Sequence, residues 1–198
     1  MQNLEIENNQ QDEESFAAID CSKGLPGLLE LPESKHRAFC GDIDIRIDAN
    51  GTWYSDGSPF TRKDLICLFA SALHRDSAGD YWIATPAELG RLTVEDAPFM
   101  AVEMFVQGDG KDQVISFRTN IDEMVTVDID HPLQVRDGKE SGENTPYVGL
   151  ERNMEAKLSR AVYYELVSHG IEEEIDGEMI YGLWSSNQFF PIGSLNEK

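Results

Sequence analysis

The chain is poor in basic residues, and this sets the first limit on its partners. Its 198 residues include 16 Lys and Arg against 37 Asp and Glu, so its formal net charge at pH 7 is −21. Non-specific nucleic-acid binding needs Lys and Arg side chains that neutralise phosphates, so the composition argues against a non-specific nucleic-acid binder. It also disfavours anionic membrane surfaces. A small phosphorylated ligand remains compatible, because a few local arginines are enough to hold it.

Cysteine and the common chemical motifs are also scarce. The three cysteines are scattered and include no C-x-x-C, which is not the pattern of a disulfide framework. The four histidines show no metal-ligand spacing, so no metal site is predicted. The sequence contains no P-loop, no dinucleotide-binding fingerprint and no G-x-S-x-G. We therefore assign no catalytic residue and no cofactor from motifs.

Long apolar runs and targeting segments are missing as well. No run approaches the ~18–20 apolar residues of a membrane-spanning helix. The first residues carry neither a basic region nor an apolar region of the kind found in signal peptides, so the expected location is cytoplasmic. Residues 1–22 are polar and aperiodic and are predicted to be a disordered acidic tail. The overall hydrophobic fraction of 40% nevertheless predicts a packed globule.

What is present is a series of short strands and two amphipathic helices. Residues 43–48 alternate strictly between apolar and polar, and Asn50-Gly51 then predicts a hairpin turn in which both positions have φ > 0. Apolar residues at helical spacing predict helices over about 62–75 and 151–168. Residues 137–146 read as a loop. Further strands are expected at 81–85, 91–94, 99–106, 114–119, 125–129, 133–135, 171–175, 179–184 and 188–192.

This order predicts an α+β fold made of two related units packed together. We expect an N-terminal unit over residues 23–90 and a C-terminal unit over residues 91–198. Residues 61–85 and 151–184 each contain a predicted helix, a turn with glycine and an aromatic strand. The sequence identity between the two stretches is slight, so the predicted duplication concerns architecture, and chance remains the alternative.

An ordered set of short motifs resembles a known bacterial family, the domain of unknown function 1285. The resemblance extends from about residue 26 to residue 193, and each motif alone is weak. The motifs are Gly41-Asp42-Ile43-Asp44-Ile45-Arg46-Ile47, Gly51-Thr52-Trp53, Gly57-Ser58-Pro59, Arg62-Lys63, Leu68-Phe69-Ala70-Ser71, Thr85-Pro86, Glu95-Asp96-Ala97-Pro98-Phe99, Phe117-Arg118-Thr119-Asn120, His131-Pro132-Leu133, Arg160-Ala161-Val162-Tyr163-Tyr164 and Gly182-Leu183-Trp184-Ser185-Ser186.

The resemblance implies several properties that composition and spacing do not. It implies a duplicated structural unit and a C-terminal half similar to pleckstrin-homology domains. It further implies a ligand site at the junction of the halves for a nucleotide-like or nucleic-acid-based ligand, and a role in signal transduction.

Two polar clusters at the ends of predicted strands are candidate ligand-binding groups. Arg118, Thr119 and Asn120 combine a bidentate donor, a hydroxyl and an amide, which suit a phosphate or a carboxylate. Trp184, Ser185 and Ser186 place an aromatic ring beside two hydroxyls. The ring could stack on a nucleobase and the hydroxyls could hydrogen-bond to its edge. The structural alternatives are an arginine paired with one of the many acids, and a core tryptophan followed by a polar turn.

Five more residues complete the candidate lining of the predicted site. Arg62, Thr85 and Glu88 flank helix and strand ends in the first unit, and Arg160 and Tyr164 share one face of the second helix. A structural salt bridge or a buried tyrosine hydroxyl explains them equally well.

The leading prediction is therefore a ligand-binding or signalling protein rather than an enzyme. A hydrolase of small phosphorylated or acylated molecules is one alternative, although no nucleophile pairs with a base at recognisable spacing. A protein-interaction adaptor is the other. A binding module requires a concave junction with arginine donors, an enzyme requires a strongly perturbed titratable group, and an adaptor requires an exposed apolar patch.

Overall fold

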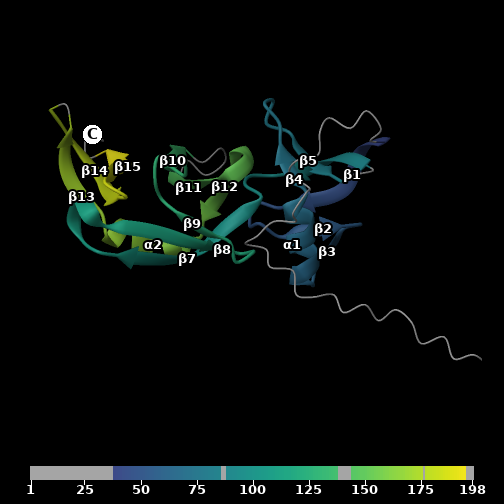
Figure 1. Ribbon diagram of the computed structural model, residues 1–198, viewed down its shortest axis with the longest axis horizontal. Coiled ribbons are helices and arrows are strands. Elements are labelled where there is room, and N and C mark those ends of the chain that lie inside the picture. The colour runs from purple at the N-terminus through teal and green to yellow at the C-terminus, as the bar shows by residue number, and fades with distance from the viewer. Residues whose placement is uncertain (1–37, 86–87, 138–143, 176, 195–198) are drawn as a thin grey trace, which may run out of the picture.

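The computed structural model describes residues 38–85, 88–137, 144–175 and 177–194, and the predicted tail at 1–22 lies outside them. Most of the described residues belong to strands, which form three sheets, and the two α-helices are short. The fold therefore contains less helix than the α+β prediction anticipated. Figure 1 shows the first sheet with α1 at one end of the molecule and β13–β15 at the other. No helix among the described residues is long and apolar enough to cross a membrane.

The first sheet has six strands in the spatial order β3-β2-β1-β6-β5-β4. Helix α1 (Lys63–Ser71) connects β3 to β4. The strands are β1 (Ala38–Ile47), β2 (Trp53–Ser55), β3 (Ser58–Pro59), β4 (Leu73–Arg75), β5 (Tyr81–Ala84) and β6 (Glu88–Val94).

The second sheet also has six strands, in the order β10-β11-β12-β7-β8-β9. Two short 3₁₀ segments, η2 (Gly110–Asp112) and η3 (Glu151–Asn153), interrupt its connections. The strands are β7 (Phe99–Gln107), β8 (Val114–Thr119), β9 (Met124–Thr126), β10 (Leu133–Asp137), β11 (Asn144–Leu150) and β12 (Met154–Leu158).

The two six-stranded sheets follow the same path. In each, three strands run outward from the centre as an antiparallel meander, and the chain then crosses to the opposite edge. Three more strands run inward until the sixth pairs in parallel with the first, β6 with β1 and β12 with β7. All other pairs within these two sheets are antiparallel. The architectural duplication thus lies in the sheets.

The helices do not share in this duplication. Helix α1 follows the third strand of the first sheet, whereas α2 (Arg160–Ser168) follows the sixth strand of the second. The predicted repeat over residues 61–85 and 151–184 therefore joins elements that are not equivalent. The chain leaves the first sheet after Val94 and enters the second at Phe99, and the expected unit boundary at residue 90 falls inside β6.

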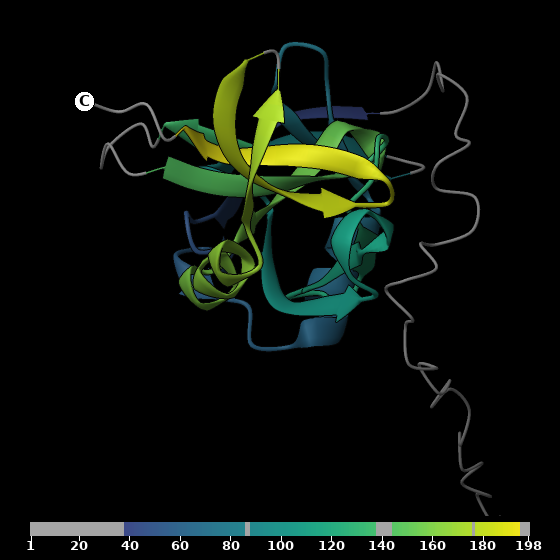
Figure 2. The ribbon, with the colours of Figure 1, turned by 90° about the vertical axis from the view of Figure 1, so that its left-hand side faces the viewer.

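A third, three-stranded antiparallel sheet completes the second unit. It consists of β13 (Ile171–Ile175), β14 (Glu178–Ser185) and β15 (Gln188–Ser194). In Figure 2 these strands cross in front of the second sheet, with α2 beside them. Ser186 and Asn187 both have positive φ in the two-residue turn that joins β14 to β15, the strands expected at 179–184 and 188–192.

The predicted helices were too long, in each case because strand residues were read as helical turns. Helix α1 ends at Ser71, and β4 occupies residues 73–75 where helix was expected. Helix α2 begins at Arg160, after Ser159, whose hydroxyl accepts a hydrogen bond from the Val162 N–H at 3.4 Å. The preceding β12 buries Met154, Ala156 and Leu158 at a period of two.

Two other local predictions also differ from the structure. The hairpin between β1 and β2 forms, but only Gly51 of the Asn50-Gly51 pair has positive φ. The Asp48 carboxylate organises this longer turn by accepting the Asn50 and Thr52 N–H groups, each at 2.9 Å. Residues 144–150, which overlap the predicted loop, form β11.

The two units share one hydrophobic core. Its buried members include Trp53 and Leu73 from the first unit, and Phe99, Phe117 and Leu166 from the second. Burial of this apolar surface across the junction fixes the facing edges of the two sheets, where the candidate site lies.

Candidate functional site at the junction of the two units

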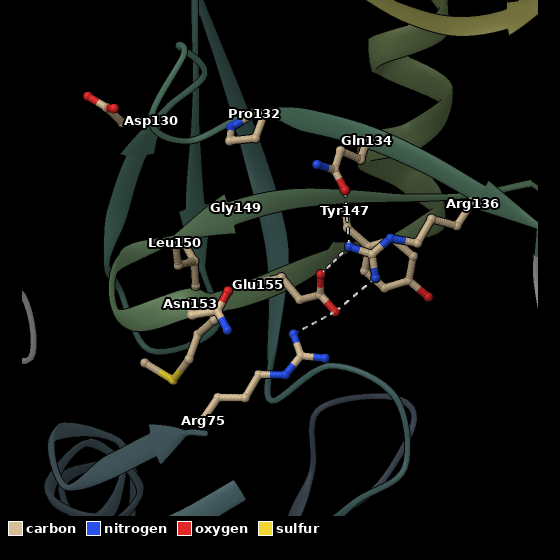
Figure 3. A pocket seen from close by; sticks show the side chains of 11 residues that line it. Arg75, Asp130, Pro132, Gln134, Arg136, Tyr147, Gly149, Leu150, Asn153 and Glu155 are labelled. Atoms are coloured by element: carbon tan, nitrogen blue, oxygen red, sulfur yellow. Dashed lines mark hydrogen bonds and ion pairs between the residues drawn. The ribbon is translucent and has the colours of Figure 1, made fainter. Parts of the chain in front are cut away.

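A cavity of about 430 Å³ opens between the two units. Arg75, at the end of β4, lines it from the first unit, and all the other lining residues belong to the second unit (Figure 3). A cavity of this size is in the range of small-molecule sites. The junction is therefore concave, as a ligand-binding module requires.

Arg136 is held firmly on the second-unit side of this cavity. Its Nη1 donates to Glu155 Oε1 at 3.0 Å, and its Nη2 donates to Glu155 Oε2 and to Gln134 Oε1. The guanidinium also covers the ring of Tyr147, 4.6 Å from the ring centroid. Glu155 is only 7% exposed, so its carboxylate depends on these contacts for compensation.

Arg75 approaches the same carboxylate from the first unit but holds it loosely. Its Nη1 lies 3.8 Å from Glu155 Oε1, which is longer than a hydrogen bond. Its guanidinium lies over the ring of Tyr81 at 5.3 Å. Among the described residues, neither the buried Arg75 Nε nor the buried Tyr81 hydroxyl has a hydrogen-bond partner.

The Tyr147 hydroxyl, by contrast, is fully engaged. It donates to Asp96 Oδ1 at 2.8 Å, and Lys157 Nζ donates to the other oxygen of that carboxylate at 2.7 Å. Burial, the bond to Asp96 and the charge of that carboxylate raise the pKa of Tyr147. Burial also raises the pKa of Tyr81, to about 12. Both tyrosines are therefore neutral donors at physiological pH.

The charge at the inner end of the cavity contrasts with that of the chain. Two guanidiniums, of Arg75 and Arg136, meet the one carboxylate of Glu155, so the three groups sum to +1 in a chain of net charge −21. Asp130 also lines the cavity, but it is exposed and Figure 3 shows it on the side away from the arginines. The inner end can therefore attract an anion.

Hydrogen bonds between the two units hold the cavity walls in place. Arg152 Nη1 donates to the carbonyls of Ser71 and Leu73 at 3.0 and 3.2 Å, which anchors the chain just before Arg75. Arg152 and Asn153 both adopt left-handed φ, at 60° and 58°. Such strain at non-glycine residues persists only where the surroundings enforce it, and it is frequent near functional sites.

A second cavity of about 340 Å³ lies on the first unit and is lined by Asp42, Asp80, Tyr81 and Arg91, among others. Arg91 Nε donates to Asp42 Oδ1 at 2.6 Å, so its charge is already compensated there. Among the described residues, no group of three or more His, Cys, Asp and Glu side chains is placed to hold a metal ion.

The first predicted cluster lies elsewhere, and its groups bond to the protein. Arg118 pairs with Glu103 at 2.7 Å and with Asp122 at 2.8 Å. The Thr119 hydroxyl accepts the Glu123 N–H at 3.1 Å inside a turn. Asn120 does lie at the junction, where its amide accepts the Met100 N–H and donates to the Gly51 carbonyl at 3.3 Å. Asn120 thus joins the two units structurally.

The second cluster is likewise engaged within the C-terminal unit. The Ser185 hydroxyl is buried, donates to the Val127 carbonyl at 2.7 Å and accepts the Ile115 N–H at 3.0 Å. The Ser186 hydroxyl donates to the same carbonyl at 3.0 Å. Trp184 is half-buried, donates to Glu173 at 3.3 Å and lies under the Lys111 ammonium.

The remaining predicted residues are dispersed. Arg62 is exposed before α1, and Thr85 and Glu88 bond to each other across the turn between β5 and β6. Arg160 is exposed at the start of α2, where Tyr164 is 71% exposed and stacks on Tyr163. None of the eleven predicted residues lines the junction cavity among the described residues.

The residues that line the junction cavity were missed for identifiable reasons. Arg75 and Glu155 fell inside the two helices that were predicted too long, and Tyr147 followed directly on a predicted loop. The alternation Leu133-Gln134-Val135-Arg136 carried a usable signal, since it places Gln134 and Arg136 on one polar face of a strand.

Fold and site together define a protein of two duplicated sheet units with a polar cavity at their junction. Two family models match the chain over residues 33–97 and 98–192, described as the N-terminal and C-terminal domains of DUF1285, a domain or protein of unknown function. The chain belongs to the DUF1285 family, as its motifs indicated.

Two crystal structures of DUF1285 family proteins are similar to this chain. The protein from Silicibacter pomeroyi DSS-3 is 35% identical, with a TM-score of 0.78, over 88% of this chain and 90% of that chain. The protein from Shewanella baltica OS155 is 29% identical, with a TM-score of 0.50, over 64% of this chain and 91% of that chain. None of the curated proteins is significantly similar to the chain.

Proposed function

We propose that this protein is a binding module that holds a small, nucleotide-like anionic ligand in the cavity between its two units. The observation that carries the proposal is the meeting of Arg75 and Arg136, one from each unit, at a single buried carboxylate in a cavity of about 430 Å³. The charge of +1 at this point suits an anion, and the exposed Gln134 amide in the cavity wall can hydrogen-bond to the rest of the ligand.

The proposal includes a role for the junction in signalling. Because the cavity has walls from both units, a ligand that contacts both stabilises their docked arrangement and can change what the whole molecule presents to a partner. The resemblance of the C-terminal unit to pleckstrin-homology domains, which the family motifs implied, remains part of this proposal.

A thermal-shift screen tests the proposal directly. The full chain is heated with nucleotides, nucleotide second messengers and short oligonucleotides at constant ionic strength. A ligand that binds the folded state raises the melting temperature by mass action. At a ligand concentration of 100 Kd, the free energy of unfolding rises by about 2.7 kcal/mol.

Two variants locate any ligand that is found. Gln134→Trp narrows the cavity from the exposed face of β10 without removing a core contact, and it should abolish the shift. Arg118→Ala removes an arginine outside the cavity and should leave the shift intact. Retention of the shift in Gln134→Trp, or the absence of any shift across the library, would contradict the proposed function.

A further inference from the structure

The duplicated sheets place two equivalent Arg–Tyr pairs at the junction. In each sheet the fourth strand contributes an arginine and the fifth strand a tyrosine whose ring the guanidinium covers: Arg75 with Tyr81, and Arg136 with Tyr147. Arg75 lies directly opposite Tyr81 in the strand register, whereas Tyr147 lies opposite Gln134, so Arg136 reaches it diagonally. Both guanidiniums point to Glu155 (Figure 3).

The second-unit pair is filled by carboxylates of the protein itself. Arg136 donates through both terminal nitrogens to the Glu155 carboxylate, and the Tyr147 hydroxyl donates to Asp96 at 2.8 Å. Both terminal nitrogens of this arginine and the hydroxyl of this tyrosine therefore meet carboxylate oxygens. This half shows which chemistry satisfies an Arg–Tyr pair in this fold.

The first-unit pair is open. The guanidinium of Arg75 stands 3.8 Å from Glu155, whose two oxygens already accept from Arg136. Three buried side-chain nitrogen or oxygen atoms in the described part of the chain lack a hydrogen-bond partner, and two of them are Arg75 Nε and the Tyr81 hydroxyl. Arginine has only donors, so what this pair lacks is an acceptor.

We infer that Arg75, whose pair with Tyr81 is open, is the anchor for an oxyanion, the carboxylate or phosphate group of the ligand, and that Arg75 turns from Glu155 to hold it. This inference rests on the proposed function and names the ligand's chemical class and its principal contact. The Arg75 side chain is 28% exposed and keeps one long ion contact, so it can turn into the cavity. Arg136 stays in place because Glu155, Gln134 and Tyr147 hold it.

The roles of the two arginines follow from this division. Arg136 and Glu155 form the fixed wall of the cavity, and Arg75 supplies the positive charge that the bound anion neutralises. Because Arg75 comes from the first unit and the wall from the second, the anchor is complete only when the two units are docked.

The test uses the full chain with orthophosphate and with succinate as separate probes. Chemical-shift titration at constant ionic strength, with chloride as the balancing anion, measures the dissociation constant of each probe. Binding of orthophosphate alone assigns the anchor to phosphate groups, and binding of succinate alone assigns it to carboxylates. Arg75→Gln should raise the dissociation constant of the probe by about tenfold or more, because a charged hydrogen bond is lost. Tyr81→Phe should raise it by a few-fold.

Arg46→Gln is the matched control. Arg46 lies in the same sheet, covers the ring of Tyr54 at 4.2 Å and pairs with Glu95, but it lines neither cavity. It removes the same charge, so it should change the affinity by less than about twofold.

Two outcomes would overturn the inference and separate it from the proposed function. If a screened nucleotide binds and Gln134→Trp abolishes binding while Arg75→Gln does not weaken it, the cavity remains the site and the open pair is not its anchor. If the wild-type chain binds neither the probes nor any nucleotide, both proposals fail together.

Discussion

Tyr81 and Tyr147 lie on equivalent strands of the two sheets, yet their hydroxyl groups have opposite surroundings. The Tyr147 hydroxyl donates to Asp96, whereas the buried Tyr81 hydroxyl has no partner among the described residues. A buried polar group without a partner carries the full cost of its desolvation, and a satisfied one returns most of it. The same residue type should therefore contribute with opposite sign at the two positions.

Replacement of each tyrosine by phenylalanine tests this contrast at neutral pH. Tyr147→Phe removes a hydrogen bond to a carboxylate and should lower the free energy of unfolding by about 1–3 kcal/mol. Tyr81→Phe removes an unsatisfied hydroxyl and should leave it unchanged or raise it by about 1 kcal/mol. Chemical denaturation measures both, and equal losses would show that Tyr81 has a hydrogen-bond partner in solution.

Tyr81 also predicts a dependence of stability on pH. Its pKa is raised to about 12 by burial, whereas an unfolded tyrosine titrates near pH 10. Between these values the unfolded chain binds fewer protons than the folded chain. The contribution of Tyr81 to stability is therefore complete below about pH 10 and is lost as the pH rises to about 12. Tyr81→Phe should show a shallower alkaline decline than the wild type in urea denaturation over that window.

At the scale of elements, the turn between β1 and β2 fixes how closely the two units approach. Gly51 has φ of 74°, and a Cβ atom there would lie 2.8 Å from Met100 Cγ on β7. Asn120 donates to the carbonyl of the same glycine. The turn therefore needs glycine both for its backbone conformation and for its contact with the second unit.

A pair of glycine variants separates these two requirements. Gly57 has a similar φ of 71° but no atom within 4 Å of its Cβ position, so Gly57→Ala should cost only the left-handed backbone, about 1–2 kcal/mol. Gly51→Ala should cost more, because Met100 must also move. Thermal unfolding of both variants gives the difference, and equal losses would mean that the contact with Met100 adapts without cost.

Element boundaries show where local patterns were ambiguous. Met154 and Leu158 are four apart, which suits a helix, but together with Ala156 they also suit a strand buried on one face. Tertiary pairing with β7 and β11 decided for the strand. That decision placed Glu155 in the cavity wall, so the error in the predicted helix and the missed site residue have one cause.

At the scale of the whole molecule, the shared core makes the two units one cooperative structure. Arg152 adds a polar link by donating to the Ser71 and Leu73 carbonyls of the first unit. Because buried residues of both units belong to one cluster, unfolding either unit would expose apolar surface on the other.

We therefore expect a single unfolding transition, weakened but not split by Arg152→Met. The variant leaves two carbonyls without their donor and should lower the free energy of unfolding by about 1–3 kcal/mol. In a Trp184→Phe background, fluorescence reports only the first unit, through Trp53 and Trp82, and circular dichroism reports both. Coincident curves in urea support the expectation, and separated curves contradict it.

Arg46→Met is the control for charge removal in that experiment. Arg46 pairs with Glu95 on the exposed surface beside the first sheet. This ion pair does not link the two units. Exposed ion pairs contribute about 0–1 kcal/mol, so the loss should be smaller than for Arg152→Met.

The sequence by itself determined the local features whose cause is local. The alternation at residues 43–48 specified a strand, and the ordered motifs specified the family. The acidic composition limited the classes of partner to expect. Only the tertiary structure decided that Arg118 of the predicted cluster would form ion pairs with Glu103 and Asp122.

Tertiary structure also brought together Arg75, Arg136 and Glu155, which are far apart in the chain. The physical reason is the strand order of each sheet. The sixth strand pairs in parallel with the first, and the fourth and fifth strands, which follow it in the sheet, then lie at the junction. A local pattern of side chains records which face of a strand is polar, but it does not record which other strand that face will meet.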